Sequence, residues 1–265
     1  MEPISSQLSL TQILLFSALI GLIIGSFISM LTWRMPRILM MEEEEQFKAI
    51  TFGGSKCPNC DAALPWFRLI PLFSWLWSKG KCHNCQTSIS PRYPLIELST
   101  ATATVLIMWL YGPTFLGFAA LLFSWILITI SVIDIEHQLI LDNLSLPLLW
   151  LGLLVNTQGL FTTPIDAIWG AIVGYMLLWI LFHSFKLLTG KEGMGYGDFK
   201  LLAALGAWFG LMAIPQIILI ASVSSLVIGL GGVLLKLRSY DSPLAFGPFL
   251  AIGGWVTLLV GISLI

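Results

Sequence analysis

The sequence contains very little charge. Only 10% of its 265 residues are Asp, Glu, Lys or Arg, whereas 57% are hydrophobic and the mean hydropathy is +0.91. A water-soluble domain normally carries about a quarter charged residues, so this composition excludes an ordinary soluble protein and indicates that lipid solvates most of the chain. Period-2 alternation of apolar and polar residues is also scarce, which argues against a transmembrane β-barrel.

Long apolar stretches recur along the whole chain. Most of them approach about 20 residues, the length that an α-helix needs to cross the hydrocarbon core of a bilayer. We therefore predict an all-α polytopic membrane protein with about eight transmembrane helices. The stretches are 10–33, 95–112, 115–133, 144–161, 166–186, 199–212, 214–235 and 246–265.

Basic residues are missing from every second connection between these stretches. With eight spans, all 13 Lys and Arg residues gather on one side of the membrane, whereas the connections near 112–115, 161–165 and 212–214 hold none. The positive-inside rule then places both termini outside the cytoplasm. Arg34 and Arg37 follow the first apolar stretch and no basic residue precedes it, so this stretch is predicted to be a retained anchor and not a cleaved signal peptide.

Cysteine is scarce as well, and all four cysteines lie in one polar segment. They form Cys57-Pro-Asn-Cys60 and Cys82-His-Asn-Cys85, with 21 residues between the pairs. Two C-x-x-C turns at about this separation present four thiolates to one zinc ion. Four thiolates close a tetrahedral shell and leave no position for water, so the ion is predicted to be structural. The alternatives are a redox dithiol, inert cysteines, or His83 as a ligand in place of one cysteine.

The cysteine segment is also the only stretch long and polar enough to form a soluble subdomain. We divide the chain into a first transmembrane helix at 1–36, a cytoplasmic tetracysteine subdomain at 37–93 and a transmembrane helical core at 94–265. The reducing cytoplasm disfavours disulfides. So short a subdomain has little hydrophobic core, and a bound metal would supply much of its folding free energy.

Acidic residues are rare outside this subdomain, which makes the remaining ones informative. Asp134 ends the third predicted span, and Asp198 begins the sixth. The third span runs inward and the sixth outward, so both aspartates are expected at the cytoplasmic membrane boundary, where ionisable groups are costly and mark functional sites. Two adjacent carboxylates do not readily ionise together. One keeps a proton while the other activates a water, as in aspartic proteases.

Other interpretations of these carboxylates stay open at this point. Glu136 and Asp142 compete with Asp134 for the first position of the pair, and this region also fits a plain polar loop. Asp198 fits a helix N-terminal residue that is favoured by the helix dipole and pairs with Lys200 or another cation. The glycines at 193, 195 and 197 are predicted to allow backbone conformations closed to other residues and to let an extended substrate approach closely.

Several segments of the chain form recognisable motifs. They are Gly21–Phe27 with Arg34–Pro36, the paired C-x-x-C motifs, Arg92–Glu97, Asp134–Asp142, Leu146–Trp150, a G-x-G-D signature in Gly193–Lys200, and Phe246–Ala251. Together these motifs resemble those of the type IV prepilin peptidases, which are bifunctional leader peptidases and N-methyltransferases. The resemblance covers nearly the whole chain, although the family often has Asn where this chain has Ser29 and Pro where it has Leu141.

The resemblance implies a bacterial inner-membrane enzyme with two activities. Asp134 and Asp198 occupy the positions of the family's catalytic aspartates. Such an enzyme cleaves the basic leader of type IV prepilins and type II secretion pseudopilins after Gly, at the cytoplasmic face. It then methylates the new N-terminal amine with S-adenosylmethionine. The chain has no glycine-rich nucleotide-binding signature, so the methyl-donor site is unassigned, and Glu97 is a weak candidate for contacting donor or substrate.

Three rival classes remain for comparison. Another intramembrane aspartyl protease with different substrates shares the G-x-G-D chemistry, but the cysteine segment argues against it. An ion-coupled transporter would place its carboxylates near the bilayer midplane and show inverted repeats. A zinc-stabilised scaffold would need neither aspartate. Prepilins, pseudopilins and membrane lipid are the expected partners, and no nucleic acid is expected among them.

Overall fold

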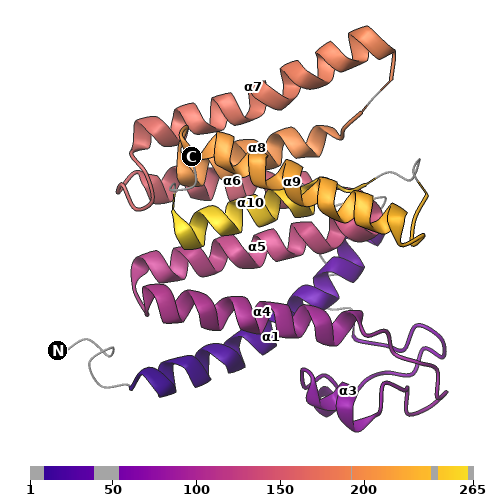
Figure 1. Ribbon diagram of the computed structural model, residues 1–265. Helices are drawn as coiled ribbons and strands as arrows, with labels where there is room; N and C mark the ends of the chain where they lie inside the picture. The colour runs from indigo at the N-terminus through magenta and orange to yellow at the C-terminus, as the bar shows by residue number, and fades with distance from the viewer. Residues whose placement is uncertain (1–8, 39–53, 192, 240–243, 262–265) are drawn as a thin grey trace. The chain divides into compact units, whose positions relative to one another are not determined.

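The regular structure of this protein is helical. The computed structural model describes residues 9–38, 54–191, 193–239 and 244–261, which contain helices and two isolated β-bridges (Figure 1). The predicted all-α class is therefore confirmed. The helices are α1 (Leu10–Ile38), η2 (Trp66–Arg68), α3 (Phe73–Trp77), α4 (Arg92–Tyr111), α5 (Phe115–His137), α6 (Asp142–Asn156), α7 (Pro164–Thr189), α8 (Tyr196–Phe209), α9 (Ala213–Leu234) and α10 (Gly247–Val260).

Each of the eight apolar stretches coincides with one of these helices, but the helices differ in length. Among the described residues, α1, α4, α5, α7 and α9 are long and apolar enough to cross a membrane. The other three have 15, 14 and 14 residues in α6, α8 and α10. At about 1.5 Å per residue these three fall short of a hydrocarbon core of about 30 Å. The structure thus supports a multi-pass protein with five candidate spans.

The chain divides into two compact units, Met1–Trp125 and Ile126–Ile265. In the first unit, α1 packs along α4. A Cβ atom added at Gly21 would lie 2.6 Å from the Cα atom of Ala101, and one at Gly25 would lie 2.6 Å from the Cα atom of Glu97. Two glycines four residues apart let helix backbones approach closely, which is how membrane helices pack. The predicted division at 36 and 93 stays a prediction.

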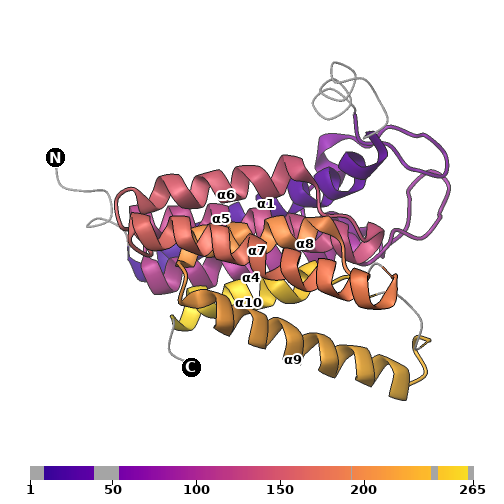
Figure 2. The same ribbon diagram turned by 90° about the horizontal axis from the view of Figure 1, so that it is seen from above.

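In the second unit, α8 is the central helix. It packs against α6, α7 and α10, and apart from Lys200 its residues are buried from Asp198 to Phe209. By contrast, α9 is buried only in its first half, as far as Ala221. Figure 2 shows that α9 begins beside α10 and then diverges from it. The helices around α8 therefore enclose almost all of it, which explains how a 14-residue helix remains stable in an apolar setting.

A buried amide completes the hydrogen bonds at the end of α8. The side-chain nitrogen of Asn156 donates to the carbonyl oxygens of Ala207 and Trp208 at 2.8 and 2.9 Å. Its side-chain oxygen accepts from the backbone N–H groups of Phe161 and Thr162. The last carbonyls of a helix lack intrahelical partners and are costly when buried in an apolar environment. Asn156 supplies those partners, so α8 can end inside the protein.

The close packing of α7 against α8 leads to a prediction about the stability of a glycine variant. A Cβ atom at Gly206 would collide with the carbonyl group of Gly170. We expect Gly206→Ala to lower stability by about 1–3 kcal/mol, the usual effect of overpacking. The matched control is Gly231→Ala in α9, where an added Cβ atom meets nothing within 4 Å. Thermal unfolding in detergent measures both, and equal midpoints for the two variants would contradict this packing.

Candidate active site and metal centre

Asp134 lies in the last turn of α5, just before the helix ends at His137. Its side chain is 4% exposed, and its Oδ2 atom accepts a hydrogen bond of 2.9 Å from the backbone N–H of Gly247. Gly247 is the first residue of α10, so this N–H has no partner within its own helix. The carboxyl group of Asp134 therefore joins the end of α5 to the start of α10.

Asp198 is the third residue of α8 and is 6% exposed. Its Oδ2 atom accepts a hydrogen bond of 3.2 Å from the N–H of Gly195, which precedes the helix. Its Oδ1 atom is buried and has no hydrogen-bond partner among the described residues. A buried polar atom is costly without a partner, and this oxygen is the one available to a water or a substrate.

The structure brings these two aspartates together. The carboxyl groups of Asp134 and Asp198 are close enough for their charges to interact. The α5–α6 loop packs against the start of α8 and the start of α10. A Cβ atom added at Gly197 would lie 2.6 Å from the Cβ atom of Ile140, and one at Gly247 would lie 3.0 Å from the Cδ1 atom of Ile140. The side chain of Ile140 thus fits between two positions that have no side chain.

The two rival carboxylates occupy different surroundings. Glu136 is exposed on the last turn of α5. The side chain of Asp142 is 53% exposed, and both of its oxygens accept hydrogen bonds from the Nζ atom of Lys200, at 2.6 and 2.7 Å. The suggested pairing of Lys200 with Asp198 is therefore wrong, because Lys200 reaches the start of α6 instead. Sequence alone missed this ion pair, whose members are 58 residues apart.

The glycines before Asp198 matter because they lack a side chain, and not because they have unusual backbone angles. Gly195 has φ −80° and ψ 148°, an extended conformation open to any residue, and Gly197 is helical. The prediction that these glycines adopt backbone conformations closed to other residues is therefore wrong for Gly195 and Gly197. A side chain at Gly195 would make ordinary contact with Asp198 at 3.5 Å, whereas one at Gly197 would displace Ile140.

This contrast gives a prediction within the glycine motif. We expect Gly197→Ala to reduce any reaction at the aspartate pair by about 10²-fold, because a shift of about 1 Å in a reacting group has that effect. Gly195→Ala adds a methyl group without a clash, so the folded protein should remain as stable as the wild type. Turnover and thermal unfolding of both variants test this. Equal turnover of the two variants would contradict the role of the Ile140 contact.

The four cysteines lie together in the first unit. Their sulfur atoms are all within 4.8 Å of one another, and the Sγ atoms of Cys57 and Cys85 are 3.8 Å apart. Each C-x-x-C motif forms the same turn. In the first turn, the backbone carbonyl oxygen of Cys57 accepts a hydrogen bond from the N–H of Asp61. In the second, the backbone carbonyl oxygen of Cys82 accepts one from the N–H of Gln86. Tetrahedral Zn–S bonds of about 2.3 Å place two sulfurs about 3.8 Å apart, so this cluster fits zinc.

The pKa values of the cluster's thiols are shifted in different directions: that of Cys57 is raised to about 11, whereas those of Cys82 and Cys85 are lowered. Hydrogen bonding from Thr87, through its side chain first and then its backbone, lowers the pKa of the Cys85 thiol to about 5. Backbone N–H groups of Cys85 and Asn84 likewise lower the pKa of Cys82. Thiolates are the form that binds zinc. His83 is exposed and does not belong to the group of ligand atoms found among the described residues.

Glu97, the candidate for donor or substrate contact, has a structural partner in the first unit. It is buried in α4, and its Oε2 atom accepts a hydrogen bond of 2.8 Å from the backbone N–H of Leu72. Leu72 has φ +58°, an uncommon conformation for a residue with a side chain. Glu97 therefore fixes a strained turn of the cysteine segment against α4.

Taken together, these features define a multi-pass helical membrane protein with a buried aspartate pair and a tetracysteine cluster. Two family models match the chain. Residues 19–111 match the bacterial peptidase A24 N-terminal domain, and residues 121–230 match the type IV leader peptidase family. The two matches fall almost entirely in the first and the second compact unit, respectively.

Curated relatives extend the match over most of the chain. The prepilin leader peptidase/N-methyltransferase of Stutzerimonas stutzeri is 46% identical over 93% of this chain and 90% of its own length. Proteins of the same name from Aeromonas salmonicida and Pseudomonas aeruginosa are each 44% identical with the same coverage. No solved structure matches significantly. The chain belongs to the type IV prepilin leader peptidase family.

Proposed function

We propose that this chain is a prepilin leader peptidase and N-methyltransferase that cleaves with Asp134 and Asp198. The observation that carries the proteolytic half is the buried pair itself. Each carboxyl group has one oxygen fixed by a backbone N–H, from Gly247 or from Gly195. Asp198 keeps a buried oxygen without a partner. That arrangement supports a site in which two aspartates share a proton and hold a water between them.

The reaction follows from general acid–base chemistry at such a pair. The ionised aspartate takes a proton from the water, whose oxygen attacks the carbonyl carbon of the scissile bond. The protonated aspartate gives its proton to the carbonyl oxygen, which forms a tetrahedral intermediate. When the intermediate collapses, the C–N bond breaks and the leaving amine takes a proton from the aspartate that received it from water. One hydroxyl group of the intermediate returns its proton to the other aspartate, which leaves a carboxylic acid and restores the singly protonated pair. The titration belongs to both aspartates together.

The substrate class follows from the family and from the position of the pair at helix ends. A prepilin presents a basic leader, a Gly at the cleavage point and then a hydrophobic helix. With that helix in the bilayer and the leader in the cytoplasm, the scissile bond lies at the level of Asp134 and Asp198. The bond must be locally extended, because a helix hides its carbonyl groups from attack. The proposed topology adds to the five candidate spans three crossings by the shorter helices α6, α8 and α10, which do not cover the full hydrocarbon thickness by themselves. With these eight crossings, both termini are extracytoplasmic and the active site faces the cytoplasm.

The two cofactors have different roles in this proposal. Zinc, held by Cys57, Cys60, Cys82 and Cys85, stabilises the cysteine segment and takes no part in cleavage. S-adenosylmethionine supplies the methyl group for the new N-terminal amine. The chain's own task in methylation is to hold that amine uncharged and accessible after the leader has left.

The test uses purified protein in lipid nanodiscs, mixed with a prepilin whose leader is basic and ends in Gly before Phe. Mass spectrometry follows the product. We expect cleavage after Gly, and a mass increase of one methyl group only when S-adenosylmethionine is added. Cleavage without methylation would remove the second activity from the proposal. An intact prepilin would favour the transporter or scaffold interpretation.

A further inference from the structure

A cluster of exposed apolar side chains lies on the cysteine segment, apart from the metal cluster. On the short helix α3, Phe73 is 66% exposed, Leu76 is 64% exposed and Trp77 is 92% exposed. Three more large apolar residues just before α3 are also exposed. We call this surface the apolar edge; it comprises Phe67, Leu69, Ile70, Phe73, Leu76 and Trp77. Contiguous exposed apolar surfaces of this kind mark sites of interaction with a partner or a membrane.

The segment that carries the apolar edge is held in place by Trp75. Trp75, between its exposed neighbours, donates a hydrogen bond of 3.1 Å from its Nε1 atom to the carbonyl oxygen of Ile89. Its ring lies against Gly80, where an added Cβ atom would be only 3.0 Å away. Trp75 therefore fixes α3 to the second cysteine turn, and Phe73, Leu76 and Trp77 are presented outward by a fixed support.

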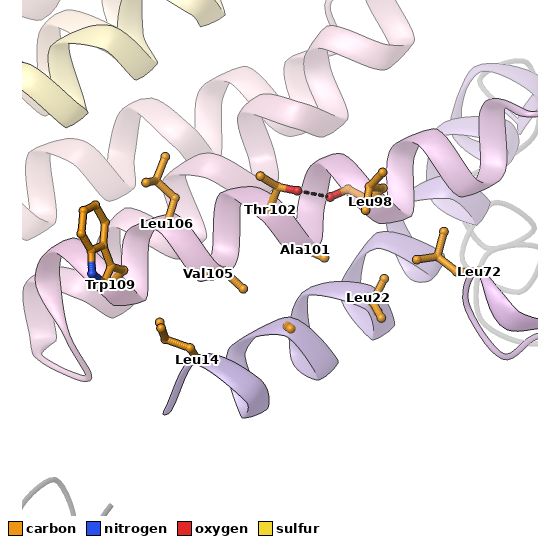
Figure 3. A pocket seen from close by; sticks show the side chains of 10 residues that line it. Leu14, Leu22, Leu72, Leu98, Ala101, Thr102, Val105, Leu106 and Trp109 are labelled. Atoms are coloured by element: carbon orange, nitrogen blue, oxygen red, sulfur yellow. Dashed lines mark hydrogen bonds between the residues drawn. The ribbon is translucent and has the colours of Figure 1, made fainter. Parts of the chain in front are cut away.

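The position of this edge is set by Leu72, which lies between Ile70 and Phe73. Its backbone N–H is held by Glu97, in the second turn of α4. Its side chain lines a groove of about 610 Å³ between α1 and α4. Figure 3 shows Leu72 at one end of that groove, beside Leu22 and Leu98. Because α1 and α4 are both candidate spans, Leu72 ties the apolar edge to the end of the membrane-facing surface of these helices.

Basic residues flank the apolar edge. The guanidinium group of Arg68 lies 5.8 Å from the centre of the Phe67 ring. Lys79 and Lys81 follow Trp77 and are exposed. Aromatic side chains beside Lys and Arg are characteristic of surfaces that lie in the interface of anionic membranes, where the rings enter the headgroup layer and the cations attract lipid phosphates.

We propose that the apolar edge is a membrane-interface anchor. It enters the boundary between headgroups and acyl chains next to α1 and α4, and it holds the cysteine segment against an anionic bilayer surface. The argument rests on the continuity of Leu72 with the apolar groove between α1 and α4 and on the basic flank. It requires only that α1 and α4 span the membrane, so it stands or falls independently of the proposed enzymatic activity.

Photocrosslinking of the full chain tests this anchor. Trp77→p-benzoylphenylalanine places a photoreactive group at the most exposed position of the edge without disturbing buried residues. The matched control is Ser88→p-benzoylphenylalanine, an exposed polar position on the second cysteine turn. Both variants are reconstituted in nanodiscs that contain phosphatidylethanolamine and phosphatidylglycerol, irradiated with and without prepilin, and analysed by mass spectrometry.

We expect lipid adducts at position 77, several-fold more than at position 88 and unchanged by prepilin. Replacing phosphatidylglycerol with phosphatidylcholine should lower the yield several-fold, because the basic flank then has no anionic headgroup to attract. Three results would overturn the proposal. They are equal lipid labelling at both positions, a prepilin adduct that replaces the lipid adduct, and a cross-link within the chain in place of lipid.

Discussion

Asp134→Asn and Asp198→Asn should each abolish prepilin cleavage, with rates lower by about 10³-fold or more, since general acid–base catalysis contributes about 10²–10⁴-fold and paired groups act as a unit. Asparagine keeps the shape of aspartate and still offers an oxygen to the N–H of Gly247 or Gly195. The fold should therefore survive while the titratable proton is lost. Cleavage rates from product masses, beside expression and thermal unfolding of each variant, provide the measurement.

The control for this prediction is Asp142→Asn. Asp142 is exposed and pairs with Lys200 at the surface, and surface ion pairs contribute only about 0–1 kcal/mol. Its variant should cleave within a few-fold of the wild type, as should Glu136→Gln. A loss at Asp142 as large as that at Asp134 would move the catalytic role to the α5–α6 loop.

Loss of zinc should unfold the cysteine segment. A structural zinc site contributes about 10–16 kcal/mol of folding free energy in small domains. In residues 54–91, the described part of this segment, the helices are α3, with five residues, and η2, with three, so little else there can replace the metal. We expect Cys57→Ser and Cys82→Ser, whose cysteines are buried, to lose bound zinc. Limited proteolysis should then cut these variants between the two C-x-x-C motifs. Elemental analysis should show zinc in the wild type and no zinc in the two cysteine variants.

His83→Ala is the matched control for the metal site. His83 lies within the second C-x-x-C motif but is exposed, so its variant should retain zinc and protease resistance. Purified wild-type protein without zinc, combined with unchanged protease resistance in the cysteine variants, would show that the cluster is inert. Loss of zinc in His83→Ala would make the histidine a ligand.

The helices were predictable from the sequence because each apolar stretch is bounded by polar or turn-forming residues. Each of the eight stretches contains a helix, and the placement of Asp134 and Asp198 at helix ends follows from where the stretches begin and stop. The lengths were less predictable. The stretch at 144–161 ends as a helix at Asn156, because the side chain of Asn156 bonds to the end of α8 and turns the chain away.

Contacts between distant residues account for what the sequence could not show. The sequence suggested that Lys200 pairs with Asp198, two residues away. A helix points residues i and i+2 to different sides, and Lys200 instead reaches Asp142. Gly197 and Gly247 both lie against Ile140, and a Cβ atom added at Gly247 would also come within 2.6 Å of the Oδ2 atom of Asp134. Hydropathy and spacing locate elements along the chain, whereas these contacts depend on how the elements pack.

The central claim is that Asp134 and Asp198 act as one catalytic pair, and the double variant tests it most directly. The cleavage rate of Asp134→Asn/Asp198→Asn is compared with those of the two single variants in the same nanodiscs. Groups that act as a unit are strongly non-additive, so the double variant should be no slower, within a few-fold, than either single variant. A double variant slower by the product of the two single effects would show that the aspartates contribute independently, which would contradict the pair.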